Sequence, residues 1–125
     1  MQEILHISIG ASIGANLRNF IVHIFKAISL NYSFPIGILF ANCLGCLLAG
    51  FFLHLNSTKA VPQFYTPLIS IGFFGALTTF STFAVDSIKL LRVSFSSGLL
   101  NIFSNLCICL LLIWVGEFLC KKIYS

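Results

Sequence analysis

Four apolar stretches, each about as long as a lipid bilayer is thick, constrain this chain more than any other feature of its sequence. They cover residues 4–25, 35–55, 66–92 and 98–119. A membrane-spanning helix needs about 20 mostly apolar residues to cross the hydrocarbon. With 125 residues, of which 58% are hydrophobic and 8% charged, the chain has too much apolar surface for a soluble core of its size. We therefore expect an all-α membrane protein, with residues 1–125 forming a single four-span domain.

The connections between these stretches are short and leave no room for a soluble domain. Pro35 opens the second span and Pro62 precedes the third, where proline suits a first helical turn. The first span lacks a basic start, carries Glu3 early and contains Arg18, so we expect it to be retained rather than cleaved as a signal peptide. No basic patch is interleaved with aromatic residues, and nucleic acid is not an expected partner. The expected location is the cell inner membrane or plasma membrane, as a multi-pass protein.

The positive charges are divided evenly between the two expected sides of the membrane. The side that holds both termini carries Lys59, Lys121 and Lys122, and the opposite side carries Lys26, Lys89 and Arg92. The positive-inside rule therefore favours neither orientation. Either other cues select one topology, or copies insert both ways up and pair antiparallel. Four short spans enclose little pore alone, so we expect a dimer in both cases.

The third span contains an unusual run of small and hydroxylated residues, "GFFGALTTFSTFAVDS" at 72–87. Gly72 and Gly75 permit close approach and unusual backbone angles, and the following "TTFST" has low helix propensity. This pattern predicts a helix break within residues 75–80. Broken backbone at membrane depth persists only where it lines a cavity, touches protein or binds an ion. The alternative is an unbroken small-residue packing face whose hydroxyls bond to their own helix.

Two phenylalanines follow the expected break with helical spacing. Phe80 and Phe83 are three residues apart, so they share one face and flank Ser81. Aromatic ring edges are partly positive, and two edges with a hydroxyl can receive a small anion without a full charge. The other interpretation is that both rings face lipid, since the chain contains 14 phenylalanines.

The five cysteines form no recognisable metal-binding motif. Cys43 and Cys46 lie one turn apart in an apolar span, Cys107 and Cys109 point to different faces, and no histidine lies nearby in the sequence. We therefore expect the cysteines to be small, soft packing residues rather than metal ligands or disulfide partners.

The run "GFFGALTTFSTF", followed by Asp86, resembles the signature of the CrcB, or Fluc, fluoride channels. Two other segments agree with that family. "GASIGANLR" at 10–18 is similar to its glycine-rich first span, which ends in arginine, and "GILFANCLGCLLAGF" at 37–51 is similar to its second span, which has a central asparagine. The resemblance extends over nearly the whole chain.

The resemblance implies a fluoride-selective ion channel that exports fluoride passively and lowers its cytoplasmic concentration. The family is an antiparallel, dual-topology homodimer in the lipid bilayer, with two pores that are each lined by both subunits. A structural sodium ion (Na⁺) lies at the dimer centre, held by backbone carbonyls of the broken third helix. In this chain those carbonyls belong to Gly75 and Thr78.

The resemblance also implies which residues line the pore. These are Asn42, Phe80, Ser81, Thr82 and Phe83, with Arg18 drawing anions toward a vestibule. The fourth span departs from the family, which usually has a track of hydroxyl side chains there. Among the polar residues that this span offers instead, Asn105 is the best candidate for the pore.

A small four-helix proton-coupled multidrug exporter is the alternative function. Such a transporter needs a carboxylate within the membrane. However, Glu3 precedes the first span, Glu117 ends the last span, and Asp86 lies beyond the expected break. A third interpretation is a membrane scaffold that does not conduct. No nucleophile, base and orienting acid share a water-accessible face, so an enzyme is not expected.

Overall fold

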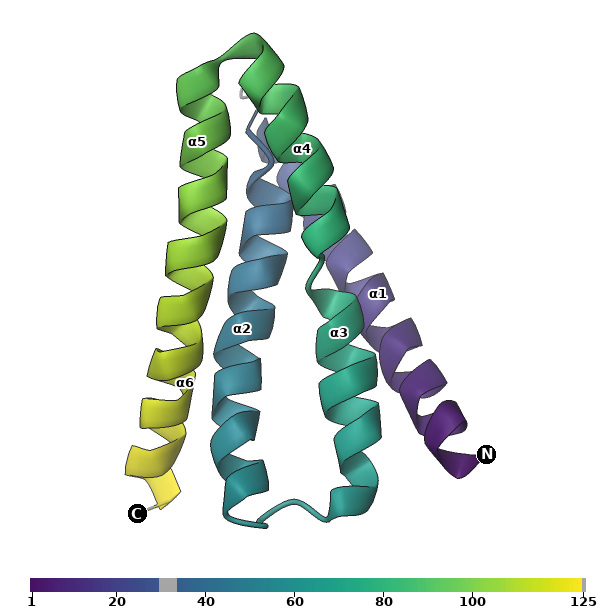
Figure 1. Ribbon diagram of the computed structural model, residues 1–125. Coiled ribbons are helices and arrows are strands. Elements are labelled where there is room, and N and C mark those ends of the chain that lie inside the picture. The colour runs from purple at the N-terminus through teal and green to yellow at the C-terminus, as the bar shows by residue number, and fades with distance from the viewer. Residues whose placement is uncertain (30–33, 125) are drawn as a thin grey trace.

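The computed structural model describes residues 1–29 and 34–124, and all regular structure in these ranges is helical (Figure 1). The first rod is α1 (Gln2–Ser29) and the second is α2 (Ile36–Ser57). The third rod consists of a 3-10 turn η1 (Gln63–Tyr65), a π-helical stretch η2 (Pro67–Phe74), α3 (Gly75–Leu77) and α4 (Phe80–Val93). The fourth consists of α5 (Phe95–Phe103), a π-helical stretch η3 (Ser104–Ile108) and α6 (Cys109–Tyr124). The expected all-α class with four helical segments is confirmed.

Three of the four rods are long and apolar enough to cross a membrane. They cover Ile36–Ser57, Gln63–Val93 and Phe95–Tyr124. The first rod has 28 residues, which is sufficient length, but Glu3, His6 and Arg18 are among the polar residues that lower its hydropathy. The chain is therefore a multi-pass membrane protein. The membrane crossing of the first rod stays a prediction.

Both ends of the chain lie at the same end of the molecule (Figure 1). The turn between α2 and η1 is at that end, and the turn between α4 and α5 is at the other. Lys121 and Lys122 occupy the last turn of α6, whereas Lys26 and Arg92 occupy the last turns of α1 and α4. The positive charges are thus divided between the two ends of the fold, as the sequence predicted.

Glycines bring the rods into backbone contact in two pairs. A Cβ added at Gly10 of α1 would overlap the main-chain carbonyl of Leu68 in η2. A Cβ added at Gly50 of α2 would overlap the carbonyl of Ile113 in α6, and Gly116 touches α2 in the same way. Small residues permit this close packing between membrane helices. The first rod therefore packs on the first half of the third, and the second rod packs on the fourth.

A small apolar core joins these two pairs beside the break in the third rod. It consists of Ile21, Ala41 and Leu77, and the last two have no exposed surface. Leu77 is the last residue of α3, so the core holds the helix end that precedes the break.

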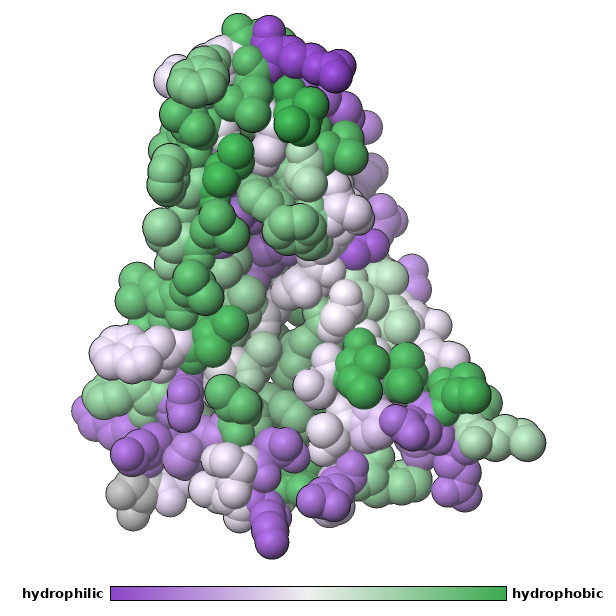
Figure 2. Space-filling model, in the orientation of Figure 1, coloured by the Kyte–Doolittle hydropathy of each residue, from purple (hydrophilic) through white to green (hydrophobic). Residues whose placement is uncertain are grey.

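The outer surface on the left of the view is mostly apolar, whereas hydrophilic residues gather toward the two ends and along the right edge, beside α1 and α4 (Figure 2). A hollow opens near the middle of the face shown in Figure 2, between α3 and the rods on the left. Large side chains such as Phe80, which is 74% exposed, contribute to the apolar belt. Such a belt suits contact with lipid or with another apolar protein surface.

Candidate functional site

The third rod is broken at Thr78 and Thr79. Both residues are extended, with φ −79° and ψ 152° at Thr78 and φ −147° and ψ 115° at Thr79. This confirms the predicted break, and threonine suits it because β-branched residues favour extended backbone. The prediction of unusual backbone angles at Gly75 is wrong, because this glycine is helical at φ −61° and ψ −30°.

The break redirects main-chain groups that a continuous helix would pair internally. The Thr79 N–H would donate to the Gly75 carbonyl in such a helix, but here it donates to Asn42 Oδ1 at 2.8 Å. The Ala76 carbonyl accepts a hydrogen bond from Arg18 Nη1 at 2.7 Å. Within residues 1–29 and 34–124, no main-chain N–H therefore reaches the Gly75 carbonyl.

The Thr78 carbonyl is left free in the same way. Its partner in a continuous helix would be the Thr82 N–H, which instead donates to Thr79 Oγ1 at 3.4 Å. The sequence nominated the carbonyls of Gly75 and Thr78 as cation ligands. Both lack a main-chain donor in the described part of the chain, and carbonyl oxygens are suitable ligands for an alkali cation. The donor set therefore fits a sodium ion.

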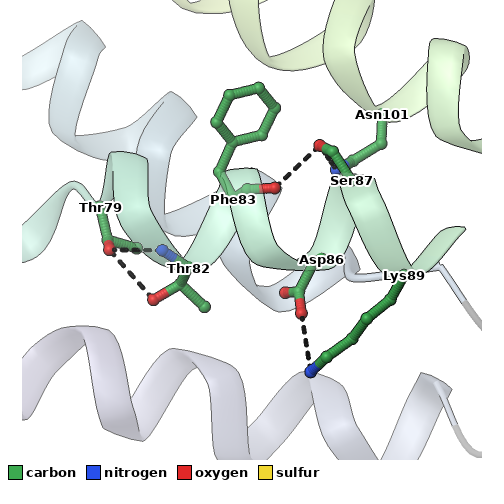
Figure 3. Close-up of polar contacts among 7 residues, drawn as sticks. All are labelled: Thr79, Thr82, Phe83, Asp86, Ser87, Lys89 and Asn101. Atoms are coloured by element: carbon green, nitrogen blue, oxygen red, sulfur yellow. Dashed lines mark hydrogen bonds and ion pairs between the residues drawn. The ribbon is translucent and has the colours of Figure 1, made fainter. Parts of the chain in front are cut away.

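A chain of buried side chains, which we call the asparagine ladder, connects the second, fourth and third rods. Asn42 Nδ2 donates to Asn105 Oδ1 at 2.9 Å, and Asn105 Nδ2 donates to Asn101 Oδ1 at 3.2 Å. Asn101 Nδ2 donates to Ser87 Oγ at 2.8 Å. Ser87 Oγ in turn donates to the Phe83 carbonyl at 2.8 Å (Figure 3). The ladder thus leaves the third rod at the break and returns to it in α4.

The asparagine ladder has a single direction because both of its ends are main-chain groups. It begins at the Thr79 N–H, which can only donate, and ends at the Phe83 carbonyl, which can only accept. Each amide between these ends is oriented by its neighbours. Sequence reasoning nominated Asn42 and Asn105 and counted Asn101 among the polar residues of the fourth span that could line the pore, but it gave no role to Ser87. The four-residue spacing of Asn101 and Asn105 within an apolar span was the available signal.

A cavity of about 280 Å³, which we call the break cavity, opens beside the break. Four of the nominated pore residues line it: Asn42, Phe80, Phe83 and Asn105. The two aromatic rings lie on one side as predicted, with centroids 5.4 Å apart and planes at 65°. Phe83 is buried and Phe80 is exposed. The other lining residues are Cys46, Thr78, Thr79, Leu106, Cys109, Leu110 and Ile113.

Three nominated pore residues do not line the break cavity. Thr82 Oγ1 accepts a hydrogen bond from Thr79 Oγ1 at 3.1 Å, so its hydroxyl supports the helix start (Figure 3). Ser81 is exposed, and its Oγ lies 3.5 Å from Thr79 Oγ1. Arg18 Nη1 donates to the Ala76 carbonyl, so within this chain it holds the broken helix, and its role in drawing anions toward a vestibule stays a prediction.

Asp86 forms an ion pair with Lys89 one turn later in α4, at 3.7 Å (Figure 3). The Lys89 side chain is 71% exposed, so the pair contributes little to stability. Among the described residues, no group of three or more His, Cys, Asp or Glu side chains is placed to hold a metal ion. The candidate site is therefore built from amides, hydroxyls, ring edges and free carbonyls.

Comparison with known proteins shows which family the chain resembles. Residues 5–117 match the family model described as CrcB-like protein, Camphor Resistance (CrcB). Over 118 residues the chain is 35% identical to the fluoride-specific ion channel FluC of Shewanella woodyi and 37% identical to that of Shewanella baltica. It is 35% identical to the protein of the same name from Shewanella oneidensis. Each alignment covers 94% of this chain and 94% of the relative.

Proposed function

This chain belongs to the CrcB family, and from that premise we propose that it is a fluoride-selective ion channel, like the relatives named fluoride-specific ion channel. It is a channel and not an enzyme. Fluoride leaves the cytoplasm passively, driven by the membrane potential, and its cytoplasmic concentration falls. The proposed location is the cell inner membrane or plasma membrane.

The observation that carries this proposal is the break cavity with its weakly polar wall. Amide groups of Asn42 and Asn105 and the rings of Phe80 and Phe83 meet there, and none of the lining residues carries a full charge. A small, strongly hydrated anion must exchange water for other donors, yet it must also be able to leave. Weak donors in series, including positive ring edges, meet both requirements.

Asn42 supplies the donor that can most easily turn to the anion. One Nδ2 hydrogen bond, to Asn105 Oδ1, is 2.9 Å long, whereas the other, to the Thr79 carbonyl, is 3.4 Å long. Hydrogen bonds at the longer distance are weak. The second amide hydrogen can therefore leave the Thr79 carbonyl for fluoride at small cost, while the first keeps Asn42 in the asparagine ladder.

Two copies of the chain form the conducting unit as an antiparallel, dual-topology homodimer. The even division of positive charge supports insertion in both orientations. Gly75 supports contact between copies, because it is exposed and an added Cβ would meet no atom within 4 Å in its own chain. A second cavity of about 360 Å³ is lined by Gly75 and Thr78 together with residues of the second rod. Free carbonyls cannot face lipid, so a partner is expected to cover them.

A sodium ion at the dimer centre is the proposed ligand of these carbonyls. Gly75 and Thr78 of each copy provide about four oxygens in total, which is a reasonable number for an alkali cation. The ion would satisfy carbonyls that the bilayer cannot, and its positive charge would favour anions nearby in a medium of low dielectric constant.

Ion efflux from liposomes tests the proposed function. Purified protein is reconstituted into vesicles loaded with potassium fluoride or potassium chloride, and valinomycin is added to allow charge balance. We expect rapid fluoride efflux at a fluoride electrode and no chloride efflux above that of protein-free vesicles. Equal efflux of both anions, or none of either, would contradict a fluoride-selective channel. Proton-coupled uptake of a cationic dye by the same vesicles would support the multidrug exporter instead.

A further inference from the structure

The second and fourth rods run in parallel with a constant register. Asn42 bonds to Asn105, a separation of 63 residues, and Gly50 packs against Ile113, which is the same separation. Cys46 and Cys109 occupy the turn between these two contacts with that same spacing. A thiol from each rod therefore faces the other across the contact between the rods.

Other features of the structure agree with this placement. Cys46 and Cys109 both line the break cavity, and Cys43, Cys107 and Cys120 do not. Neither residue is fully buried, so small solutes in the cavity can reach them. Cys107, by contrast, is exposed two residues away on another side of the helix, and Cys120 is buried without exposed surface.

We propose that Cys46 and Cys109 form a dithiol site for a soft divalent cation of the mercury(II) type. Thiolate sulfur is a soft ligand that selects soft metals. Binding breaks two S–H bonds and forms two Hg–S bonds: Hg²⁺ and two thiols give a neutral RS–Hg–SR unit and two protons. The protons leave through the cavity, and no atom changes its oxidation state.

The charge of the product favours a divalent ion over a monovalent one. Mercury(II) with two thiolates is neutral, whereas silver(I) or copper(I) with two thiolates carries one negative charge. Burying an uncompensated charge in an apolar environment is costly. The absence of a third ligand group among the described residues also disfavours zinc, whose structural sites use four protein ligands.

The site has a consequence for conduction, which rests on the proposed function. Cys46 and Cys109 share the wall of the break cavity with Asn42, Asn105 and Phe83. A metal ion held between the two thiols would occupy part of a cavity of about 280 Å³. We therefore expect mercury(II) to block fluoride efflux.

Metal retention in detergent tests the site without reference to conduction. The test protein, which we call the paired-thiol protein, keeps Cys46 and Cys109, with Cys43, Cys107 and Cys120 changed to alanine. It receives one equivalent of Hg²⁺ and is then washed with excess monothiol, and retained mercury is measured by mass spectrometry. We expect about one mercury per chain, held roughly 100-fold more tightly than by one thiol, because the second ligand binds intramolecularly.

Matched controls are the same protein with Cys46→Ala or Cys109→Ala, and a variant that keeps only Cys107 and Cys120. We expect all three to lose mercury to the monothiol. Equal mercury retention by the paired-thiol protein and by either single-thiol variant would overturn the proposal. Loss of mercury from the paired-thiol protein would overturn it too. Each variant must elute as a folded species in size-exclusion chromatography. If Cys46→Ala or Cys109→Ala does not, Cys46→Ser or Cys109→Ser takes its place.

The liposome assay separates this proposal from the proposed function. In vesicles, Hg²⁺ should abolish fluoride efflux through the paired-thiol protein, and a competing dithiol should restore it. Efflux through each single-thiol variant, compared with its own mercury-free rate, should persist. Mercury retention without any fluoride efflux would support the dithiol site and contradict the channel. Efflux that mercury leaves unchanged in the paired-thiol protein would contradict the block.

Discussion

Replacing Asn42 by alanine removes the side chain that holds the broken third rod against the second and fourth rods. Asn42 Oδ1 accepts the Thr79 N–H at 2.8 Å, and Asn42 Nδ2 donates to Asn105 Oδ1 at 2.9 Å. Thr79 and Asn105 are 9% and 5% exposed and both line the break cavity, so only water within that cavity can replace the lost partner. Alanine therefore leaves one buried donor and one buried acceptor unpaired.

The expected loss of stability follows from these two orphaned groups. Leaving a buried polar group unsatisfied costs about 1–3 kcal/mol, which gives about 2–6 kcal/mol for two. Hydrogen bonds between membrane helices average only about 0.6 kcal/mol, because the unfolded chain also finds partners in the membrane. We therefore expect Asn42→Ala to lower the free energy of unfolding by about 2 kcal/mol, toward the lower end of the range. Fluoride efflux should also fall, because a donor in the break cavity is lost.

The measurement is reversible unfolding in mixed micelles with increasing sodium dodecyl sulfate, followed by circular dichroism. Asn16→Ala is the matched control, because Asn16 makes one exposed hydrogen bond, to the Ser12 carbonyl at 2.8 Å. Asn16→Ala should change the free energy of unfolding by no more than about 0.5 kcal/mol. If Asn42→Ala and Asn16→Ala were equally stable and conducted equally well, the asparagine ladder would not hold the break.

The remaining predictions concern the pore, the ion and the topology. Phe80→Ile or Phe83→Ile should severely reduce fluoride efflux at similar bulk while the dimer elutes unchanged; parent-like efflux would identify both rings as packing residues. Gly75→Val should abolish efflux by crowding the contact between copies, whereas Thr78→Ser should be mild because only its carbonyl binds the ion; the reverse order would contradict the sodium site. Arg18→Gln should destabilise the protein by about 1–3 kcal/mol, because the Ala76 carbonyl loses its charged donor; wild-type stability in the same micelle titration would refute this. A single introduced cysteine in a cysteine-free background should label from both sides of the membrane, and labelling from one side alone would exclude dual topology.

Local properties of the sequence were sufficient for the fold class and the break. Apolar length predicted the helical rods, since a hydrophobic stretch of about 20 residues has few other stable arrangements in lipid. Consecutive β-branched hydroxyl residues predicted the interruption at Thr78 and Thr79, because their conformational preference and capping ability act within a few residues. The three-residue spacing of Phe80 and Phe83 predicted their pairing for the same reason.

Only the tertiary structure decided what these local features contact. Asn42 Oδ1 accepts the Thr79 N–H and so completes the hydrogen bonds of the break, and Arg18 donates to the Ala76 carbonyl; the sequence predicted neither contact. Gly75 is helical, so its role depends on surrounding space and not on its backbone angles.

The cysteines show most clearly what the sequence determined and what only the tertiary structure decided. Within the sequence, Cys46 and Cys109 belong to different apolar segments and read as packing residues. They meet because the second and fourth rods pack in parallel, in a register set by Gly50 against Ile113 and by Asn42 against Asn105. Hydropathy determines which segments enter the membrane, but it is nearly the same on every side of such a helix. The side that faces a neighbouring rod, and the residues it meets there, depend on close packing and buried polar contacts between distant parts of the chain.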